Sequence, residues 1–154
     1  MVDLRKMLGY DEGLRLTAYL CPARKLTVGY GHNLDADKAL SILHRNINIG
    51  DKITLDEADK LLDYDIQKAV SGINKKLPGF SDLQEKYRVV LINMAFNIGI
   101  NGILTFKNTI KSMFANNDVA VIAGIKNSAY YRQVTNRANR MISIIKGVIP
   151  SEYS

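Results

Sequence analysis

The longest periodic pattern of apolar residues in the chain runs from residue 55 to residue 76. Its apolar positions recur every three or four residues: Leu55, Ala58, Leu62, Ile66, Ala69 and Ile73. At its start, Thr54 and Glu57 form a capping box, in which each side chain can bond to an unpaired backbone N–H. The pattern predicts a helix of roughly 20 residues and about 30 Å, long enough to connect two lobes.

Shorter helical patterns precede and follow this segment. Near the N-terminus, apolar spacing predicts a helix over residues 2–10, weakened at its end by Gly9. A second capping box at residues 81–84 predicts a helix that ends at Gly99 and is buried, because its latter half is apolar on nearly every face. A modest helix is expected within residues 35–49. Three more are expected at residues 106–115, 118–126 and 135–146, with Gly147 following the last.

Alternating apolar and polar residues predict a β-hairpin after the first helix. The two alternating runs are residues 14–20 and 25–30, and a Pro-containing turn that begins at Cys21 separates them. Glu12 then lies just before the first strand, and Thr27 lies early in the second. We expect the side chains of Glu12, Cys21 and Thr27 to come back toward one edge of a small sheet.

Helices and one short sheet, without alternating strand–helix units, predict an α+β fold. We expect a single domain with a small antiparallel sheet lobe over about residues 12–54, followed by a connecting helix over about 55–76. A helical lobe is expected over about residues 77–154, joined by the N-terminal helix 2–10. A chain of 154 residues is long enough to bury a core of this kind.

Composition narrows the classes of partner. The net charge of +6 favours an anionic partner, which could be a nucleic acid, a membrane surface or an acidic polymer such as bacterial cell wall. The single cysteine excludes an intrachain disulfide. The N-terminus lacks an apolar run of signal-peptide length, and no segment approaches the roughly 20 apolar residues of a membrane span. We therefore expect a protein that is made soluble and unexported, without stable membrane association.

The histidines and acidic residues do not form a metal-binding pattern. Only His32 and His44 are present, and neither belongs to an H-E-x-x-H motif or to a Cys/His cluster. We expect neither a metal nor another cofactor.

Several ordered motifs resemble one enzyme family. The segment Tyr10–His32, with E-G-L-R-L-x-x-Y followed by T-V-G-Y-G-H, is similar to the phage-type lysozymes of the T-even kind, glycoside hydrolase family 24. Ile53–Asp65 resembles the inter-lobe helix of that family, and Leu91–Gly99 with Phe106–Thr109 resembles its central helix and the turn beyond. Thr135–Arg140 matches its late T-N-R-A-x-R segment. The resemblance covers most of the chain and implies a two-lobed lysozyme-like fold.

Glu12 is the candidate acid. Cleavage of a glycosidic bond requires a carboxylic acid to protonate the leaving oxygen and a second group to activate water or stabilise the cation. The family uses the glutamate that matches Glu12 as its general acid, and we expect Gly13 to let the backbone pass closely there. By itself, the residue would read as an exposed carboxylate at a helix end.

Cys21 departs from the usual family pattern. The T-even enzymes carry an aspartate at this position, which assists the attack of water, although some relatives carry cysteine. A thiol with a pKa near 8.5 is a weak base at neutral pH unless it is activated, and Arg24 and Lys25 are candidates for that activation. Arg24 stands where a turn glycine is common. The alternative is that Cys21 is an inert turn residue.

Other matched positions have supporting parts in the family. Thr27 matches a threonine that positions the attacking water, with an ordinary strand threonine as the alternative. His32 matches a histidine that pairs with the inter-lobe helix, where Asp65 lies on an otherwise apolar stripe. We read this pair as a structural salt bridge, with a part in catalysis as the alternative. Arg137 is expected to pair with Glu12, with a solvated helix face as the alternative.

Three positions match residues that touch saccharide in the family: Asn33, Phe96 and Thr109. Of these only Phe96 is an identity, and a core aromatic is an equal alternative for it.

The resemblance implies an endolysin that acts as a muramidase. It would hydrolyse the β-1,4 bond between N-acetylmuramic acid and N-acetylglucosamine in bacterial peptidoglycan and so lyse cells. We expect a monomer that accumulates in the host cytoplasm and reaches the wall through a separate membrane pore. Nucleic acid is not expected as a partner, because the basic residues are scattered and no helix-turn-helix is recognisable. The alternatives are a lytic transglycosylase, which needs no water-activating partner, and a non-catalytic wall-binding protein.

Overall fold

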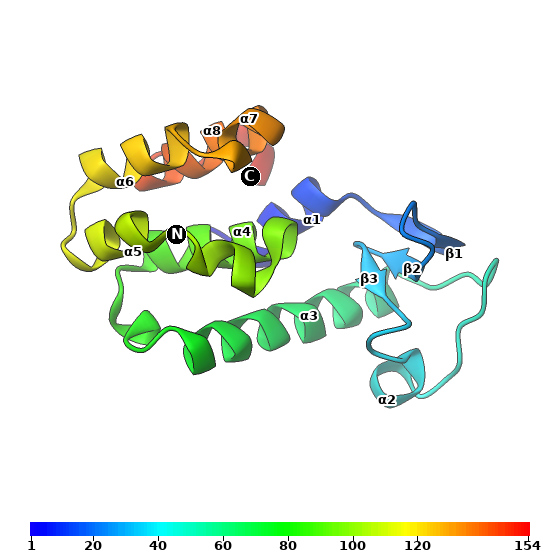
Figure 1. Cartoon of the computed structure of the whole chain (residues 1–154). Coiled ribbons are helices and arrows are strands. Elements are labelled where there is room, and N and C mark those ends of the chain that lie inside the picture. The colour runs from blue at the N-terminus through cyan, green and yellow to red at the C-terminus, as the bar shows by residue number, and fades with distance from the viewer. The chain divides into compact units, whose positions relative to one another are not determined.

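The computed structural model describes all residues, 1–154, and divides into two compact units. The sheet unit consists of residues 3–68, and the helical unit consists of residues 69–154 with residues 1 and 2. One three-stranded antiparallel sheet accompanies the helices, so the predicted α+β class is confirmed (Figure 1). In this division the N-terminal helix groups with the sheet, whereas we expected it in the helical lobe.

The sheet unit contains the first part of the chain, coloured blue to cyan in Figure 1. Its elements are α1 (Leu4–Glu12), β1 (Arg15–Leu20), β2 (Leu26–Gly29), β3 (His32–Asn33), α2 (Ala39–Leu43) and the first turns of α3 (Leu55–Lys76). The boundary between the units falls within α3, after Lys68.

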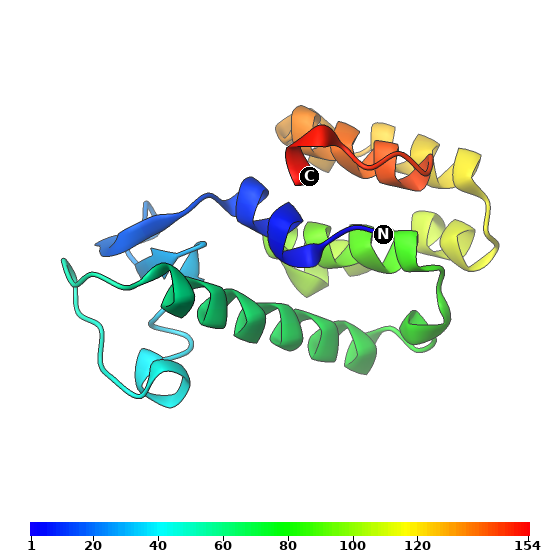
Figure 2. The same ribbon diagram turned by 180° about the vertical axis from the view of Figure 1, so that it is seen from behind.

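The helical unit follows in green to red, and Figure 2 shows the same chain path from behind. Beyond the end of α3 it contains η1 (Phe80–Asp82), α4 (Glu85–Leu104), α5 (Lys107–Phe114), α6 (Asp118–Lys126), α7 (Ala129–Gln133), α8 (Thr135–Ile145) and η2 (Ser151–Tyr153).

Helix α1 begins with a side-chain cap and extends further than expected. The Asp3 carboxylate accepts hydrogen bonds from the backbone N–H groups of Arg5 and Lys6, at 2.9 and 3.1 Å. Gly9 does not end the helix. A Cβ at Gly9 would lie 3.3 Å from the Tyr30 ring, so the missing side chain lets α1 approach the residue after β2.

The hairpin turn forms as the Pro-containing sequence predicts. The Cys21 carbonyl accepts a hydrogen bond from the Arg24 N–H at 2.8 Å, and the Cys21 N–H donates to the Lys25 carbonyl at 3.0 Å. Pro22 stands at the second position of this four-residue turn, where its fixed φ is favourable. Arg24 has a φ of +60°, the left-handed conformation that glycine adopts at low cost.

The sheet has the order β1-β2-β3, and its buried residues Ala18 and Val28 share one core cluster with Ala58 and Leu61 of α3. Thr27 lies on the central strand, paired with Tyr19 of β1 and with Asn33 of β3. The core of the sheet unit consists of Ala18, Val28, Leu34, Ala39, Ile47, Ile53, Ala58 and Leu61.

Helix α3 has the predicted bounds and the predicted capping box. The Thr54 N–H donates to Glu57 at 3.0 Å, and the Glu57 N–H donates to the Thr54 hydroxyl at 3.1 Å. Arg45 also binds Glu57, which together with the capping bonds lowers the pKa of Glu57 to about 2.

Helix α4 differs from the prediction at both ends. The second capping box is wrong: residues 80–82 form the 3₁₀ helix η1, and α4 begins at Glu85 without a side-chain cap. At Gly99 the backbone has a φ of +75°, which breaks the helical path before a last turn reaches Leu104. By length and hydropathy α4 does qualify as a possible membrane span, contrary to our expectation for the sequence. A core helix passes the same test, and residues 89–94 of α4 are buried.

The last helices are close to the predicted ranges. Helices α5, α6 and α8 are present, and α8 ends in a Schellman motif: Gly147 has a φ of +84°, and the Val148 N–H donates to the Ser143 carbonyl at 2.9 Å. The short helix α7 was not predicted, because five residues are too few to show a periodic pattern.

Candidate functional site

Glu12 is the last residue of α1 and is half-buried. Gly13 follows as the C-cap with a φ of +72°, and its N–H donates to the Gly9 carbonyl at 3.1 Å. A Cβ at Gly13 would meet no atom within 4 Å, so the expected close approach of backbone is wrong. The glycine is needed for its left-handed φ, which turns the chain out of α1 immediately after the carboxylate.

Cys21 begins the hairpin turn and is partly exposed. A hydrogen bond from the Lys25 backbone N–H is the main cause that lowers the pKa of the Cys21 thiol, with the Thr27 hydroxyl as a further contributor. We expected the basic side chains of Arg24 and Lys25 to activate the thiol, but the main contribution comes from the backbone N–H of Lys25. The turn geometry, which brings Lys25 back to Cys21, creates this environment.

Thr27 is buried beside Cys21 on the central strand. Its hydroxyl donates a hydrogen bond to the Lys25 carbonyl at 2.8 Å, and the residue is 5% exposed. The single proton of this hydroxyl can be donated either to the Lys25 carbonyl or to the Cys21 sulfur, and in both cases the Thr27 oxygen keeps lone pairs that can accept a hydrogen bond. It can therefore accept a hydrogen bond from a water molecule next to the Cys21 sulfur.

The hairpin brings two of the three candidates together. Cys21 and Thr27 meet at the turn end, whereas Glu12 precedes β1 and Cys21 follows it. Strand β1 thus lies between the carboxylate and the thiol along the sheet. The expectation that Glu12 gathers with Cys21 and Thr27 at one edge of the sheet stays a prediction.

His32 and Asp65 are in contact. The Nδ1 atom of His32 lies 2.8 and 3.0 Å from the two Asp65 carboxylate oxygens, and Nε2 lies 2.8 Å from the Asp37 carbonyl. The histidine is 1% exposed. Burial lowers the pKa of His32, but the hydrogen bond and charge of Asp65, with smaller contributions from Asp37, outweigh it and raise the pKa above the ordinary value.

A charged network surrounds this pair. The Asp37 carboxylate accepts a hydrogen bond from Tyr64 at 2.9 Å and pairs with Lys68. Burial opposes the charge of Asp37, but these two donors and His32 hold its pKa below the ordinary value. The Tyr64 ring meets the His32 ring edge-on, with centroids 6.3 Å apart. The network ties the loop after β3 to α3.

In the helical unit, Arg137 is buried on α8 and is held by α4. Its Nε donates to the Asn93 side-chain oxygen at 2.8 Å, and a terminal nitrogen donates to the Asn93 carbonyl at 3.2 Å. Asn93 is itself fully buried. The two bonds fix the guanidinium plane, and the pairing with Glu12 stays a prediction.

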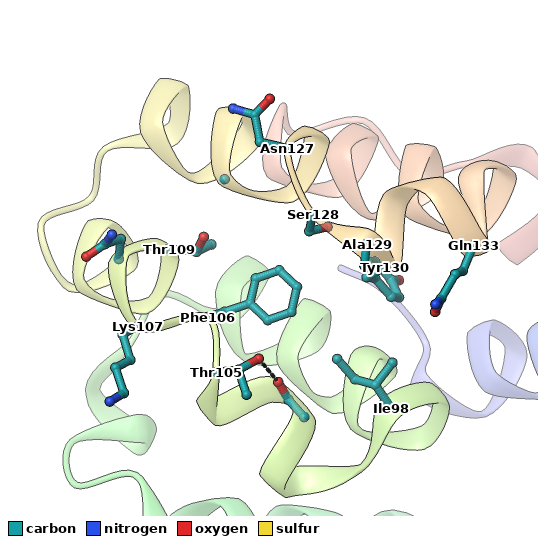
Figure 3. A pocket seen from close by; sticks show the side chains of 13 residues that line it. Ile98, Thr105, Phe106, Lys107, Thr109, Asn127, Ser128, Ala129, Tyr130 and Gln133 are labelled. Carbon is teal, nitrogen blue, oxygen red and sulfur yellow. Dashed lines mark hydrogen bonds between the residues drawn. The ribbon is translucent and has the colours of Figure 1, made fainter.

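A pocket of about 470 Å³ lies in the helical unit, among α5, α6, α7 and the end of α4 (Figure 3). Its lining includes Ile98, Phe106, Thr109, Asn127, Tyr130 and Gln133. Phe106 and Tyr130 meet edge to face with centroids 6.4 Å apart. Aromatic rings with hydroxyl and amide groups around them, and Lys107 as the only charged lining residue, suit a neutral, polar ligand such as a sugar.

Thr109 of α5 lies against Gly124 of α6. A Cβ at Gly124 of α6 would stand 2.1 Å from the Thr109 hydroxyl oxygen, so only glycine leaves room for this side chain. Thr109 is thus the one predicted saccharide contact that lines the pocket. Phe96 is half-buried on α4 outside it.

The Asn33 side chain mainly holds its own loop. Its amide oxygen accepts hydrogen bonds from the N–H groups of Asp35 and Ala36, at 2.9 and 3.1 Å. A contact with saccharide would therefore use the amide nitrogen of Asn33. No group of three or more His, Cys, Asp or Glu side chains is arranged so that it could hold a metal ion.

Sequence reasoning missed the residues that α7 brings to the pocket. Tyr130 and Gln133 lie on this short helix, which starts where the Ser128 hydroxyl accepts a hydrogen bond from the Tyr131 N–H at 3.1 Å. A serine cap before a short aromatic run is the only local signal that could have indicated it.

Comparisons with known proteins agree with these features. The family model described as phage lysozyme matches residues 10–138. The chain is similar to the probable T4-type lysozyme 1 of Dictyostelium discoideum, with 30% identity over 159 residues that cover 94% of each chain. It is 28% identical to the pre-baseplate central spike protein Gp5 of Enterobacteria phage T4 over 94% of this chain and 28% of that protein. An endolysin of Acyrthosiphon pisum secondary endosymbiont phage 1 is 34% identical over 94 residues, which are 61% of this chain and 56% of the endolysin.

Proposed function

Because this chain belongs to the phage lysozyme family and is a lysozyme-type glycosidase, we propose that it hydrolyses the β-1,4 bond between N-acetylmuramic acid and N-acetylglucosamine in peptidoglycan. One observation carries the proposal. The hairpin turn holds the Cys21 thiol and the Thr27 hydroxyl side by side, in the same unit that presents Glu12 at the end of a helix.

Glu12 supplies the proton in this mechanism. As a carboxylic acid it protonates the glycosidic oxygen that leaves, so that the C1–O bond breaks without expelling an alkoxide. Its half-buried position at the end of α1, immediately before the Gly13 turn, holds the carboxyl on a rigid element.

Cys21 and Thr27 act on the water. The Thr27 oxygen accepts a hydrogen bond from the water, and the Cys21 thiolate removes a proton while the water oxygen attacks C1. The lowered pKa of Cys21 raises the fraction of thiolate near neutral pH. The sulfur could instead attack C1 directly, which would give a covalent intermediate and retention of configuration.

The pocket of the helical unit supports binding of the sugar chain. Its rings, hydroxyls and amides match the apolar faces and polar edges of saccharides, and Thr109 is part of its lining. We further propose that the protein is a monomeric endolysin that accumulates in the cytoplasm of a bacterial host and reaches the wall through a separate membrane pore.

The products of wall digestion test this function. Mass spectrometry of soluble muropeptides should find chains that end in reducing N-acetylmuramic acid, since water is the acceptor, and the Glu12→Gln protein should release none. Ends with N-acetylglucosamine, or no turbidity loss of a wall suspension, would contradict the proposal.

A lytic transglycosylase is the second candidate, and Cys21 is the observation that favours it. Such an enzyme needs one acid/base group and no partner that activates water, so a thiol in place of the usual carboxylate is compatible with it. In that case the muropeptides would carry 1,6-anhydro ends. A protein that binds walls and releases no muropeptides of either kind would be a non-catalytic binder.

A further inference from the structure

Charge is divided unevenly between the two units. The helical unit contains 11 Lys and Arg residues against 4 Asp and Glu residues, a net charge of +7. The sheet unit contains 10 basic residues against 11 acidic ones, a net charge of −1. Protonation of His32 would only bring the sheet unit to neutrality. The entire positive excess of the protein therefore lies on one of its two units.

Ion pairs within the units deepen this contrast. In the sheet unit, several basic side chains have acidic partners: Arg5 contacts Asp63 at 2.5 Å, Arg45 contacts Glu57 at 2.8 Å, and Lys68 contacts Asp37. In the helical unit, Lys86 contacts Asp118 at 2.7 Å. Only three other carboxylate side chains are present there, so most of its cations have no acidic neighbour to neutralise them within that unit.

The unneutralised cations are at the surface. Lys75, Lys111 and Lys126 stand in the last turns of α3, α5 and α6, and Lys146 caps α8; all four are exposed. The positive charge is thus spread over the ends of several helices.

We propose that the helical unit is the surface by which this protein adsorbs to the anionic polymer of the bacterial wall. The inference rests on the proposed function and adds to it a division of labour: the helical unit supplies adsorption, and the near-neutral sheet unit carries Glu12, Cys21 and Thr27. The anionic groups are the carboxylates of peptide stems or the phosphates of polymers attached to the wall.

The distribution of charge favours an irregular polyanion over the other two classes of partner. A nucleic-acid groove is normally read by a basic row on one helix, but here the exposed lysines are spread over the ends of α3, α5, α6 and α8. A membrane-surface helix needs an exposed apolar face beside its basic face. The apolar face of α8 is buried, including Ala138, Met141 and Ile145. A flexible wall polymer can contact dispersed cations one at a time.

Two triple variants with the same change in charge test this proposal. One replaces Lys111, Lys126 and Lys146 of the helical unit by Glu. The other replaces Lys6, Lys38 and Lys52 of the sheet unit, which are also exposed and make no ion pair. Both changes bring the net charge from +6 to 0. Each is made in the full chain with Glu12→Gln, so that sedimentation with purified walls measures binding without cleavage.

The helical variant should bind walls on the order of tenfold more weakly at low ionic strength, and salt should remove most of the difference. The sheet variant should lose less than about twofold by the same electrostatic argument. Equal losses in the two variants, or none in either, would overturn the proposal. Thermal melts check folding, and the matching Lys→Gln triples replace any Glu triple that does not fold.

Further experiments distinguish stem carboxylates from wall phosphates, and walls from membranes or nucleic acid, as the anionic partner. Walls stripped of phosphate polymers by acid should show the same difference in binding between the helical and sheet variants if stem carboxylates are the ligand. The difference should be smaller if phosphates are the ligand. A difference in binding between the two variants that is seen only with anionic phospholipid vesicles or duplex DNA, and not with walls, would overturn the proposal. Cleavage of soluble muropeptides by the triples with Glu12 restored reports the proposed function separately, because it does not require adsorption.

Discussion

His32 donates from both ring nitrogens, from Nδ1 to the Asp65 carboxylate at 2.8 Å and from Nε2 to the Asp37 carbonyl at 2.8 Å. A carbonyl oxygen can only accept, and so can an ionised carboxylate. Both nitrogens therefore carry protons when Asp65 is ionised, and the buried ring is an imidazolium. This agrees with the raised pKa of His32.

We expect Asp65→Asn to lower the free energy of unfolding by about 1.5–3 kcal/mol near pH 6, because the buried imidazolium of His32 loses the negative charge of its hydrogen-bond acceptor. The folded pKa of His32 is raised, so the stabilisation is fully present below its unfolded pKa of about 6.5 and is lost as pH rises through the folded value. Urea denaturation of both proteins across pH 5–9 measures this. A constant difference, or an NMR titration with His32 at its free value, would contradict it.

Glu12→Gln should fold normally and lose wall lysis by roughly 10²–10⁴-fold, since the amide cannot donate the proton. The matched control is Asp11→Asn, which removes the neighbouring carboxylate of α1 and should keep most of the activity. Activity of Glu12→Gln above about a tenth of the wild-type rate, equivalent to ~1.4 kcal/mol of barrier, would remove this residue from the mechanism.

Three substitutions at Cys21 define its role. Cys21→Ser keeps the size without a readily ionised group and should be impaired by about 10²-fold or more. Cys21→Asp should be active. The acid limb of its pH–activity profile should move to lower pH, because the base must be deprotonated and a carboxylate ionises near pH 4 whereas a thiol ionises near 8.5. The lowered pKa of the Cys21 thiol moves the wild-type profile toward lower pH as well. Wild-type rates for both Cys21→Ser and Cys21→Ala would make the thiol an ordinary turn residue.

Arg24→Gly should stabilise the protein by roughly 0.5–1 kcal/mol. The native φ of +60° strains an arginine by ~1–2 kcal/mol, and glycine relieves this while losing more backbone entropy on folding. Lys25→Gly is the control, because Lys25 does not have a positive φ and glycine there should destabilise. Chemical denaturation of the two variants should therefore give shifts of opposite sign.

Gly124→Ala should destabilise the helical unit by about 1–3 kcal/mol, since its Cβ would clash with the Thr109 hydroxyl 2.1 Å away. The added Thr109→Ala change removes that oxygen and should recover most of the lost stability in a double-mutant cycle. The single variant should also weaken saccharide binding, measured as KM on soluble muropeptides. Additive effects of the two changes would show that the close approach is not what constrains them.

Elements with strong local signals were predictable from the sequence. The capping box of Thr54 and Glu57 and the apolar period after it placed α3 at its observed bounds. The Pro-containing run placed the hairpin turn, and the motif-level resemblance pointed to His32 and Asp65 as partners. In each case the determining interactions join residues close in sequence or belong to a pattern specific enough to recognise.

Weak or ambiguous local signals misled the prediction. The motif at Ser81–Gln84 has capping-box residues, yet the chain forms η1 there, because Gly79 and Leu83 turn the backbone before the helix can start. Gly9 is typical of a helix end, but α1 continues past it, and the missing side chain of Gly9 leaves room for the Tyr30 ring. Packing against Tyr30 outweighed helix propensity at Gly9, whereas the local backbone conformation decided the structure of residues 79–83.

The chemistry of the site depends on distances that no local pattern contains. The sequence by itself determined the residue types, the hairpin, the long helix and the family motifs that carry Glu12, Cys21 and Thr27. Only the tertiary structure decided that the Lys25 backbone lowers the pKa of Cys21, that His32 is charged, and that Gly124 makes room for Thr109. The physical reason is that hydrogen bonds, burial and steric exclusion act through space over a few ångströms, between groups whose separation along the chain does not reveal their contact.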